Sequence, residues 1–532
     1  MPTLNWIGKE KVVNHHRDVP FRVLEHKYGF TAEEGESSEA TGSGNMIIHG
    51  DNLEALKALL PEYEGKVKCI YIDPPYNTGN EGWVYNDNVN DPKIRKWLGD
   101  VVGRQGDDLS RHDKWLCMMY PRLMLLYKLL ARDGVIFVSI DDNALSYLLP
   151  LMNEVFGAGN FVTNVIWEKA DSPRNSARQF STDHDYIVVF SKNSDWTPYK
   201  LPRDEKSNSI YTNPDNDPRG PWIPGDPYAN KPYSKGEYTI KGPTGRTFQP
   251  PKGRFWRISE EKLKELDSDG RIWWGPNNSA RPSIKRYLNE VSDLVPRTLW
   301  KKDEVGSNRT SKNEMRAIFA ETSSFDTPKP SLLIERILRL STKENDIILD
   351  SFAGSGTTAH AVVSLNKSDG GNRKFILVEM EDYANSTTAE RVKRVAIGYG
   401  DKKKAVEGTG GSFDYFELGA PLFSGDNQEY LNEAVGVEKI RQYIWYSETR
   451  TPLIQNPSSS DNQYYLGSKE ATAYYFVYDK KALTTLDYEF LATIKTRAGQ
   501  YVIYADNCLL SKEYMAKHNI IFKKIPRDIT RF

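Results

Sequence analysis

The chain has 532 residues, more than one ordinary domain holds, and its 39% hydrophobic and 27% charged residues are a usual balance for a protein with a buried core. A formal net charge of -1 does not exclude a nucleic-acid partner, because phosphates respond to local charge rather than to the sum. The three cysteines form no CxxC pair, the eight histidines lack metal-ligand spacing, and no apolar run reaches the ~18 residues of a membrane span. We expect a soluble, cytoplasmic protein without a metal.

The first part of the chain alternates short apolar strands with helical stretches. Residues 31–45 are small and acidic, which predicts a linker after a short N-terminal arm. Strands are expected at 46–49, 69–72, 134–140, 161–167 and 186–190, and helices at 52–60, 116–131 and 143–156. Strands separated by helices predict a mostly parallel α/β sheet.

The pattern is interrupted after residue 194 and then resumes. The interruption is rich in Pro, Gly and Asn and holds six of the chain's 12 tryptophans. A helix at 331–340, a strand at 347–349, a helix from 357 and a strand at 375–378 follow, and then a Tyr-rich segment with strands at 464–478 and 501–504. The predicted division is an arm and linker (1–45), an α/β domain in two halves (46–194 and 327–400), an insert (195–326) and a C-terminal α+β domain (401–532).

The first chemical motif follows the second predicted strand: Asp73, Pro74, Pro75 and Tyr76. An aromatic amine is a poor nucleophile because its lone pair is conjugated into the ring. Two rigid acceptors for its N–H groups would help it to attack, and the Asp73 carboxylate and the Pro74 carbonyl are the candidates, held by the prolines. Tyr76 would stack on a base flipped out of a duplex. The alternative is a rigid capping turn after a strand.

The second motif joins the strand at 347–349 to the helix from 357 by a glycine turn, which lets backbone approach a cofactor closely. Glu379, at the end of the next strand, suits ribose hydroxyls. The glycine spacing also fits a dinucleotide-binding loop, so NAD remains an alternative cofactor. Hydride transfer does not require the Asp-Pro-Pro-Tyr motif (DPPY, residues 73–76), which argues against NAD. The candidate cofactor-binding residues of this motif are Asp350, Phe352, Ala353, Gly354, Ser355, Gly356 and Thr357.

The order of the motifs resembles that of the β group of the amino-methyltransferase superfamily: DPPY (residues 73–76) comes first, a long insert follows, and FAGSGTT (residues 352–358) comes last. The runs GDNLEALKALL, DPPYNTGNEGWVYND, HDKWLCMMYPRL and KKIPRDI resemble the modification subunits of type III restriction–modification systems. The resemblance implies a permuted, Rossmann-like, mostly parallel seven-stranded sheet that binds S-adenosyl-L-methionine (AdoMet). It also implies methyl transfer to N6 of adenine in double-stranded DNA, with cytosine N4 as the alternative.

The resemblance adds further site residues and partners. Asp51 would contact the adenine of AdoMet, although a helix N-cap explains it equally well. The segment Thr327-Pro328-Lys329-Pro330, with Lys329 and Pro330 as the site residues, would close over the methionine portion of AdoMet, and Tyr186 would lie beside the target-base pocket. The family resemblance implies a homodimer and a partner endonuclease/helicase subunit. This chain has no GxxxxGK[ST] motif, so we expect that it is not the ATP-driven subunit itself.

The insert is the predicted target-recognition domain, because cations and flat rings alternate in it and basic side chains suit phosphates and guanine edges. A small domain held together by aromatic packing is the alternative. A catalytically silent DNA-recognition subunit is a further alternative for the whole chain. The residues that carry the pattern are Arg254, Trp256, Arg257, Arg271, Trp273, Trp274, Arg281, Lys285 and Arg286.

Overall fold

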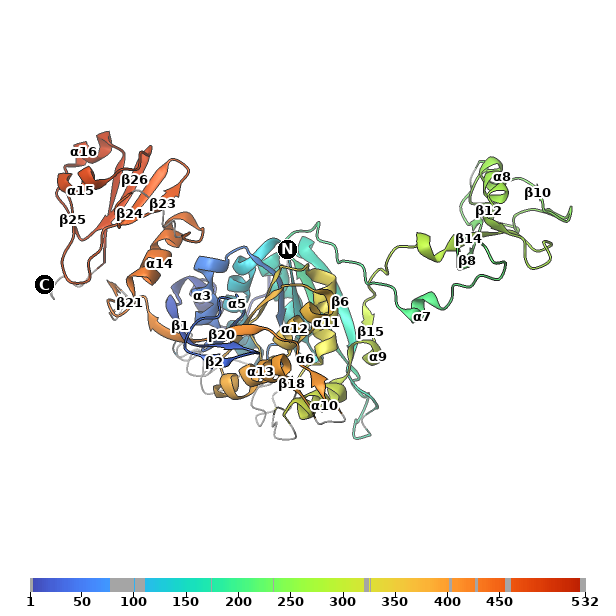
Figure 1. The fold of residues 1–532 in the computed structure, drawn as a ribbon, viewed down its shortest axis with the longest axis horizontal. Helices are drawn as coiled ribbons and strands as arrows, with labels where there is room; N and C mark the ends of the chain where they lie inside the picture. The colour runs from blue at the N-terminus through green and yellow to red at the C-terminus, as the bar shows by residue number, and fades with distance from the viewer. Residues whose placement is uncertain are drawn as a thin grey trace. The chain divides into compact units, whose positions relative to one another are not determined.

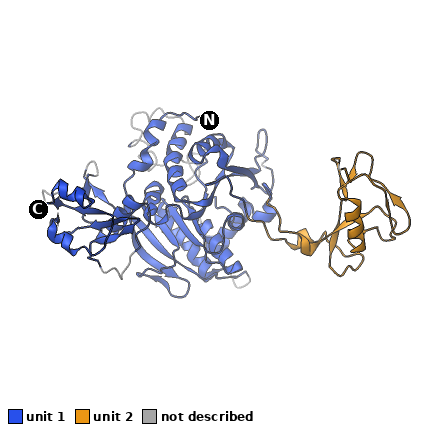
Figure 2. Ribbon diagram, turned by 90° about the horizontal axis from the view of Figure 1, so that it is seen from above, with its two compact units in different colours: residues 1–198, 297–532 blue, residues 199–296 orange. Residues whose placement is uncertain are grey.

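A computed structural model describes residues 3–76, 100, 111–173, 175–232, 234–319, 325, 327–400, 404–425, 429–454 and 461–526. The continuation of the DPPY motif after Tyr76 lies outside these ranges. The chain forms two compact units, one made of residues 1–198 and 297–532 and the other of residues 199–296 (Figure 2). The smaller unit therefore begins and ends inside the insert expected at 195–326.

The larger unit is built on one 11-stranded sheet in the order β15-β6-β7-β5-β4-β16-β17-β3-β20-β1-β2. Its strands are β1 (Arg22–Thr31), β2 (Gly35–Ser37), β3 (Met46–His49), β4 (Val67–Ile72), β5 (Leu130–Ile140), β6 (Phe161–Glu168), β7 (His184–Ser191), β15 (Leu299–Trp300), β16 (Ile347–Asp350), β17 (Lys374–Glu379) and β20 (Ser412–Pro421).

The seven strands from β6 to β3 are the mostly parallel sheet that the sequence predicts. Only β7 runs against the others, pairing antiparallel with both β5 and β6. The centre is fully parallel, since β4 pairs with β5 and β16, and β17 pairs with β16 and β3. β4 and β16 are neighbours in the sheet although the whole smaller unit lies between them in the sequence.

The sheet extends beyond the prediction at one edge. β1 and β2 form within residues expected to be an arm and a linker, and β20 comes from the segment assigned to the C-terminal domain. β20 pairs parallel with β3 and antiparallel with β1, and the two long strands lie side by side (Figure 1). Tyr28 stacks on Tyr415 across that pair, with ring centroids 5.0 Å apart.

Helices pack on both faces of the sheet. Ile70 and Ile72 of β4 belong to the core with α3, α5 and α6, whereas Cys69 lies near Ser341 of α11, so alternate residues face opposite layers. The helices of this unit outside its C-terminal part are α1 (Lys9–Val12), α2 (His15–Asp18), α3 (Asn52–Tyr63), α5 (Arg111–Leu129), α6 (Asp142–Phe156), α9 (Lys302–Val305), α10 (Asn308–Phe319), α11 (Ser331–Ser341), α12 (Thr357–Asp369) and α13 (Glu390–Ile397).

The C-terminal part adds a four-stranded sheet in the order β23-β24-β26-β28. The predicted strand at 464–478 is a hairpin of β23 and β24, and the one at 501–504 is β26. No described helix is long and apolar enough to cross a membrane. The elements are α14 (Val437–Thr449), β23 (Tyr465–Lys469), β24 (Thr472–Phe476), β25 (Thr485–Leu486), α15 (Tyr488–Thr493), β26 (Gln500–Ala505), β27 (Asn507–Cys508), α16 (Lys512–Lys517) and β28 (Ile520–Lys524).

The smaller unit has short strands around an aromatic core that contains Trp256 and Trp274, which are buried. The unit contains a three-stranded antiparallel sheet in the order β13-β14-β8. Its elements are α7 (Glu205–Asn208), β8 (Trp222–Gly225), β9 (Tyr228–Ala229), β10 (Ile240–Lys241), β11 (Thr247–Phe248), β12 (Phe255–Trp256), α8 (Glu260–Ser268), β13 (Ile272–Trp273) and β14 (Ser283–Tyr287).

Candidate active site

Polar residues gather where the parallel strands end. β4 ends at Ile72, directly before Asp73, while β16 ends at Asp350 and β17 ends at Glu379. These strands are parallel neighbours, so their carboxyl ends lie along the same edge of the sheet, the edge at which open α/β sheets bind ligands.

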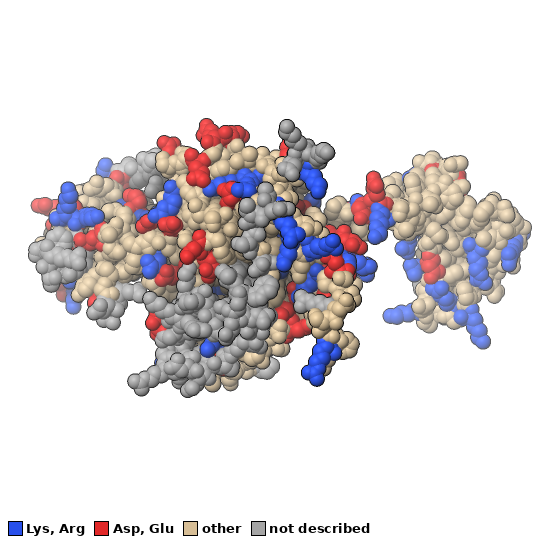
Figure 3. All heavy atoms as spheres, turned by 90° about the horizontal axis from the view of Figure 1, so that it is seen from below, with Lys and Arg blue, Asp and Glu red and all other residues tan. Residues whose placement is uncertain are grey.

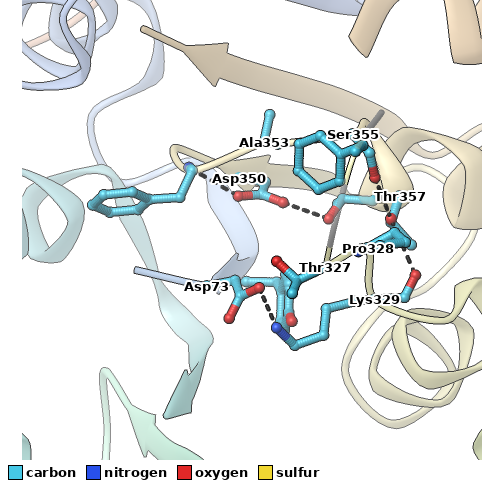
Figure 4. Close-up of a pocket in the computed structure, with 13 residues that line it drawn as sticks. Asp73, Thr327, Pro328, Lys329, Asp350, Ala353, Ser355 and Thr357 are labelled. Carbon is cyan, nitrogen blue, oxygen red and sulfur yellow. Dashed lines mark hydrogen bonds and ion pairs between the residues drawn. The ribbon is translucent and has the colours of Figure 1, made fainter. Parts of the chain in front are cut away.

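A pocket opens at this edge, with an empty volume of about 300 Å³ (Figure 4). It brings the two sequence motifs together although they are far apart in the chain. The lining residues that the sequence predicted are Asp73, Lys329, Asp350, Phe352, Ala353, Gly354, Ser355 and Thr357. Thr327 and Pro328, which precede Lys329 in the segment expected over the cofactor, also line the pocket, as do Tyr71, Phe325 and Thr358, which were not predicted as site residues.

Asp73 and Lys329 form a buried ion pair in this pocket. Lys329 Nζ donates to Asp73 Oδ2, and their side chains are only 11% (Asp73) and 8% (Lys329) exposed (Figure 4). Asp73 Oδ1 is buried and accepts no hydrogen bond within the described residues. A buried acceptor of this kind is costly unless a ligand supplies its donor.

A hydrogen bond from α5 fixes the turn that carries Asp73. Trp115 of α5 donates from Nε1 to the Pro75 carbonyl at 2.6 Å, and its ring is buried in the core. Tyr76 is buried, and Lys329 Nζ lies 5.1 Å from the centre of its ring. Burial and the neighbouring Asp73 carboxylate raise the pKa of Tyr76 well above its usual value, so its phenol stays neutral.

Two carboxylates hold the glycine loop after β16. Asp350 accepts from Phe352 N at 3.0 Å and from Thr358 Oγ1 at 2.6 Å, and burial raises the pKa of Asp350 to about 7. Glu379 accepts from Gly354 N at 2.7 Å and from Glu381 N at 2.9 Å. Glu379 is buried against the loop and is not among the pocket-lining residues.

The loop uses glycine where its backbone is left-handed, with φ of 53° at Gly354 and 79° at Gly356. A Cβ on Gly356 would lie 2.8 Å from the Thr388 carbonyl oxygen, and Thr388 Oγ1 in turn donates to the Gly354 carbonyl at 2.6 Å. Gly356 is therefore required by packing within the fold, whereas its predicted role was contact with a cofactor.

Besides Pro75, Tyr76, Gly356 and Glu379, four further predicted site residues are not among those that line the pocket. Asp51 caps α3, accepting from Leu53 N at 2.9 Å and Glu54 N at 3.1 Å, which is the capping alternative considered for it. Pro330 is the N-cap residue of α11, directly after Lys329. The other two are Pro74 and Tyr186.

Tyr186 lies near the same edge, because it pairs with Ile140, the last residue of β5. Its hydroxyl is 3.1 Å from His184 Nε2. The buried charge beside it was missed by sequence reasoning: Asp185 is 3% exposed and binds Lys169 Nζ at 2.5 Å. Burial raises the pKa of Asp185, against the opposing effect of the Lys169 charge. A carboxylate in an otherwise apolar strand was the available signal.

Residues 67–390 match the N6/N4 methyltransferase family model, described as DNA methylase. The chain is 36% identical over 373 residues to the Type III restriction-modification enzyme StyLTI Mod subunit of Salmonella typhimurium, which covers 68% of this chain. The alignment spans only 56% of that relative's length. This chain is also 32% identical to the Type II methyltransferase M.KpnI of Klebsiella pneumoniae, and the alignment covers 66% of this chain and 84% of that relative. The PvuII DNA methyltransferase (cytosine-N4-specific) covers 65% of this chain and 86% of its own, with 14% identity and a TM-score of 0.35.

Proposed function

The chain belongs to the DNA methylase family of N6/N4 methyltransferases, and from that premise we propose that it transfers a methyl group from AdoMet to N6 of adenine in double-stranded DNA. The observation that carries the proposal is the placement of Asp73. Its Oδ1 is a buried acceptor with no hydrogen-bond donor among the residues that the structure describes, in the same pocket as the glycine loop after β16. An amino group brought to that pocket would supply the missing donor.

Asp73 and the turn after it would act on the amine. Asp73 Oδ1 and the Pro74 carbonyl would accept its two N–H groups and draw the nitrogen lone pair out of conjugation, an interaction that strengthens toward the transition state. The Trp115 hydrogen bond to the Pro75 carbonyl keeps this turn in place. Tyr76, a neutral and buried ring, would stack on the flipped base, with Tyr186 as a second contact.

The residues around the glycine loop fit a cofactor with a carboxylate, ribose hydroxyls and a purine. Asp350 and Glu379 fix the loop backbone, while the Lys329 ammonium and the Ser355 and Thr357 hydroxyls line the pocket. AdoMet supplies an electrophilic methyl group when it is bound. Lys329 and Pro330 would close over its methionine portion, and Phe352, Ala353, Gly354 and Gly356 would approach it through the backbone. Asp51 remains a proposed contact for its adenine ring.

The smaller unit is the proposed DNA-recognition part. Several predicted contacts serve the unit's own structure instead: Trp256 is core, Arg271 binds Glu290 at 2.6 Å, and Lys285 binds Asp217 at 2.7 Å. Four exposed arginines form no ion pair within the described residues, and we call them the insert patch: Arg246, Arg257, Arg281 and Arg286.

Arg246, Arg257 and Arg281 of the insert patch each donate a hydrogen bond to the backbone of their own unit, which fixes their guanidinium groups. Arg257 Nη2 donates to the Tyr228 carbonyl at 3.2 Å, and Arg281 Nη1 donates to the Gln249 carbonyl at 3.1 Å and lies 3.4 Å from the Tyr228 hydroxyl. Figure 3 shows basic side chains over the visible face of this unit. Fixed guanidinium groups with free N–H donors suit phosphates and guanine edges.

The methylated base is the direct test of the proposed reaction. Duplex DNA incubated with the protein and AdoMet should yield N6-methyladenine, measured by mass spectrometry of the hydrolysed nucleosides. The preference for adenine comes from the type III resemblance, since both target amines need the same two acceptors. N4-methylcytosine as the sole product would overturn the base assignment, and no methylated nucleoside with either duplex or single-stranded DNA would overturn the reaction.

Removing two arginines of the insert patch should weaken DNA binding in a salt-dependent way. For Arg257→Ala/Arg281→Ala, each lost phosphate contact should reduce the slope of log K against log [salt] by about 0.9. Titrations of labelled duplex at several salt concentrations measure this slope. Lys264→Ala is the matched control, because Lys264 is exposed on the same unit but paired with Glu260 at 2.6 Å. Equal slopes for all three proteins would remove the patch from the DNA interface.

The relatives' names also support a proposal about assembly. Because one relative is a Mod subunit of a type III restriction-modification enzyme, we infer that this chain acts with a restriction subunit that carries endonuclease and helicase activity. The homodimer stays a proposal that comes from the family resemblance alone.

A further inference from the structure

A fully buried arginine lies behind the glycine loop. Arg391, on α13, has 0% of its surface exposed and is absent from the pocket lining. Placing a guanidinium where water cannot reach it is costly unless its donors are satisfied by fixed partners. Nε has no hydrogen-bond partner among the described residues, so the partners of Nη1 and Nη2 indicate what the buried charge holds together.

One side of the guanidinium faces the loop. Arg391 Nη1 donates to Ser355 Oγ at 2.9 Å and to Thr357 Oγ1 at 2.8 Å, and both of these residues line the pocket. Thr357 Oγ1 in turn donates to the Lys329 carbonyl at 3.2 Å. Arg391 thus reaches both walls of the pocket, the glycine loop directly and the Lys329 segment through Thr357.

The other side is fixed by two further helices. Arg391 Nη2 lies 2.9 Å from Glu314 Oε2 of α10 and 3.1 Å from His360 Nδ1 of α12. Burial and the Arg391 charge lower the pKa of His360 to about 4, so its ring is neutral near pH 7 and Nδ1 can accept. Glu314 also accepts from Ser331 Oγ, at the start of α11, so the carboxylate ties the arginine to the chain that follows Lys329.

We propose that Arg391 is a positioning residue for the cofactor: it sets the Ser355 and Thr357 hydroxyls and, through Thr357, the Lys329 segment in the geometry that binds AdoMet. This inference rests on the proposed function and deepens it. Arg391 hydrogen-bonds Ser355 and Thr357 of the glycine loop directly, and Asp73 is not among its partners within the described residues, so its loss should weaken AdoMet binding more than it slows the chemical step.

The variants are Arg391→Met, which removes the donors, and Arg391→Lys, which keeps the charge but not the planar fork. Arg391→Met loses the charge-assisted hydrogen bonds that stabilise the AdoMet-binding geometry, so we expect the Kd for AdoMet to rise about 10- to 100-fold. The rise should be smaller in Arg391→Lys. At saturating AdoMet, kcat should stay within about threefold of wild type, and the Kd for DNA should not change. Calorimetry with AdoMet and steady-state kinetics provide these values.

Arg373→Met is the matched control. Arg373 is 5% exposed and binds Thr342, Asp369 and Asn366, none of which lines the pocket. Its loss should lower the thermal unfolding temperature as an Arg391 variant does, without changing the Kd for AdoMet. If both Met variants change that Kd equally, or Arg391→Met does not change it, Arg391 has only a structural role.

Two further comparisons keep the test decisive. Should Arg391→Met fail to fold, Arg391→Lys and Glu314→Gln take its place, and an unchanged Kd for AdoMet in both overturns the proposal. A wild-type protein that neither binds AdoMet nor methylates DNA would instead overturn the proposed function. Measurements on the wild-type protein therefore test the proposed methyl transfer, and those on the variants test the role of Arg391.

Discussion

Replacing Asp73 with alanine should reduce methyl transfer by about 10²- to 10³-fold, because the variant loses the carboxylate that would accept the amine N–H in the transition state. The Kd values for AdoMet and DNA should change by no more than about threefold, since the interaction matters chiefly in the transition state. Single-turnover methylation with labelled AdoMet, together with equilibrium titrations of both ligands, measures the separation between binding and chemistry.

The control for this variant concerns Lys329. Alanine at position 73 leaves a buried ammonium without its partner, and breaking a buried pair from one side costs about 3–5 kcal/mol of folding stability. Asp73→Ala/Lys329→Met removes both charges and should recover most of the thermal stability, yet remain inactive. Near-normal turnover in folded Asp73→Ala would remove the carboxylate from the mechanism.

Replacing Gly356 with valine should destabilise the protein and weaken AdoMet binding together. Left-handed backbone at φ 79° costs a residue with a side chain roughly 1–2 kcal/mol, and the new Cβ would lie 2.8 Å from the Thr388 carbonyl, adding about 1–3 kcal/mol of overpacking. Thr388 also holds the Gly354 carbonyl, so relieving the clash moves the loop. Thermal unfolding and calorimetry with AdoMet report the two effects separately.

The other end of the same helix provides the control. Gly370 ends α12 with φ 73°, and a Cβ there would have nothing within 4 Å. Gly370→Val should therefore show the backbone strain alone, with a smaller fall in the unfolding temperature and an unchanged Kd for AdoMet. Indistinguishable behaviour of the two variants would mean that packing against Thr388 is not what requires glycine at position 356.

The central sheet could be predicted from the sequence because its strands are short apolar runs, and the expected strand at 46–49 coincides with β3. β1 was missed because Arg22–Thr31 carries charges and is only partly buried, and because its partner β20 begins at Ser412. The motif residues of the pocket were found because glycine turns and DPPY are local patterns. The Asp73–Lys329 pair was not, because a contact across 256 residues leaves no local pattern.

The insert shows a different limit. Its cations and tryptophans were read together as a DNA surface, but charge pairing is decided by three-dimensional neighbours. Arg271 and Lys285 bind acidic residues of their own unit. Arg286, the residue after Lys285, lies against Gly225 instead and has no ion pair among the described residues. Composition could therefore predict a basic unit without saying which of its cations remain available to a ligand.

The separation of Asp73 from Lys329 also has a consequence during synthesis of the chain. The two residues are 256 positions apart, so at about 5–20 residues per second the ribosome adds the lysine roughly 10–50 s after the aspartate. Throughout that interval β4 lacks its neighbour β16, so one edge of β4 has no partner strand, although all six of its residues are buried in the folded protein. A growing chain is therefore open to wrong pairing, and chaperone demand should depend on translation speed through the insert.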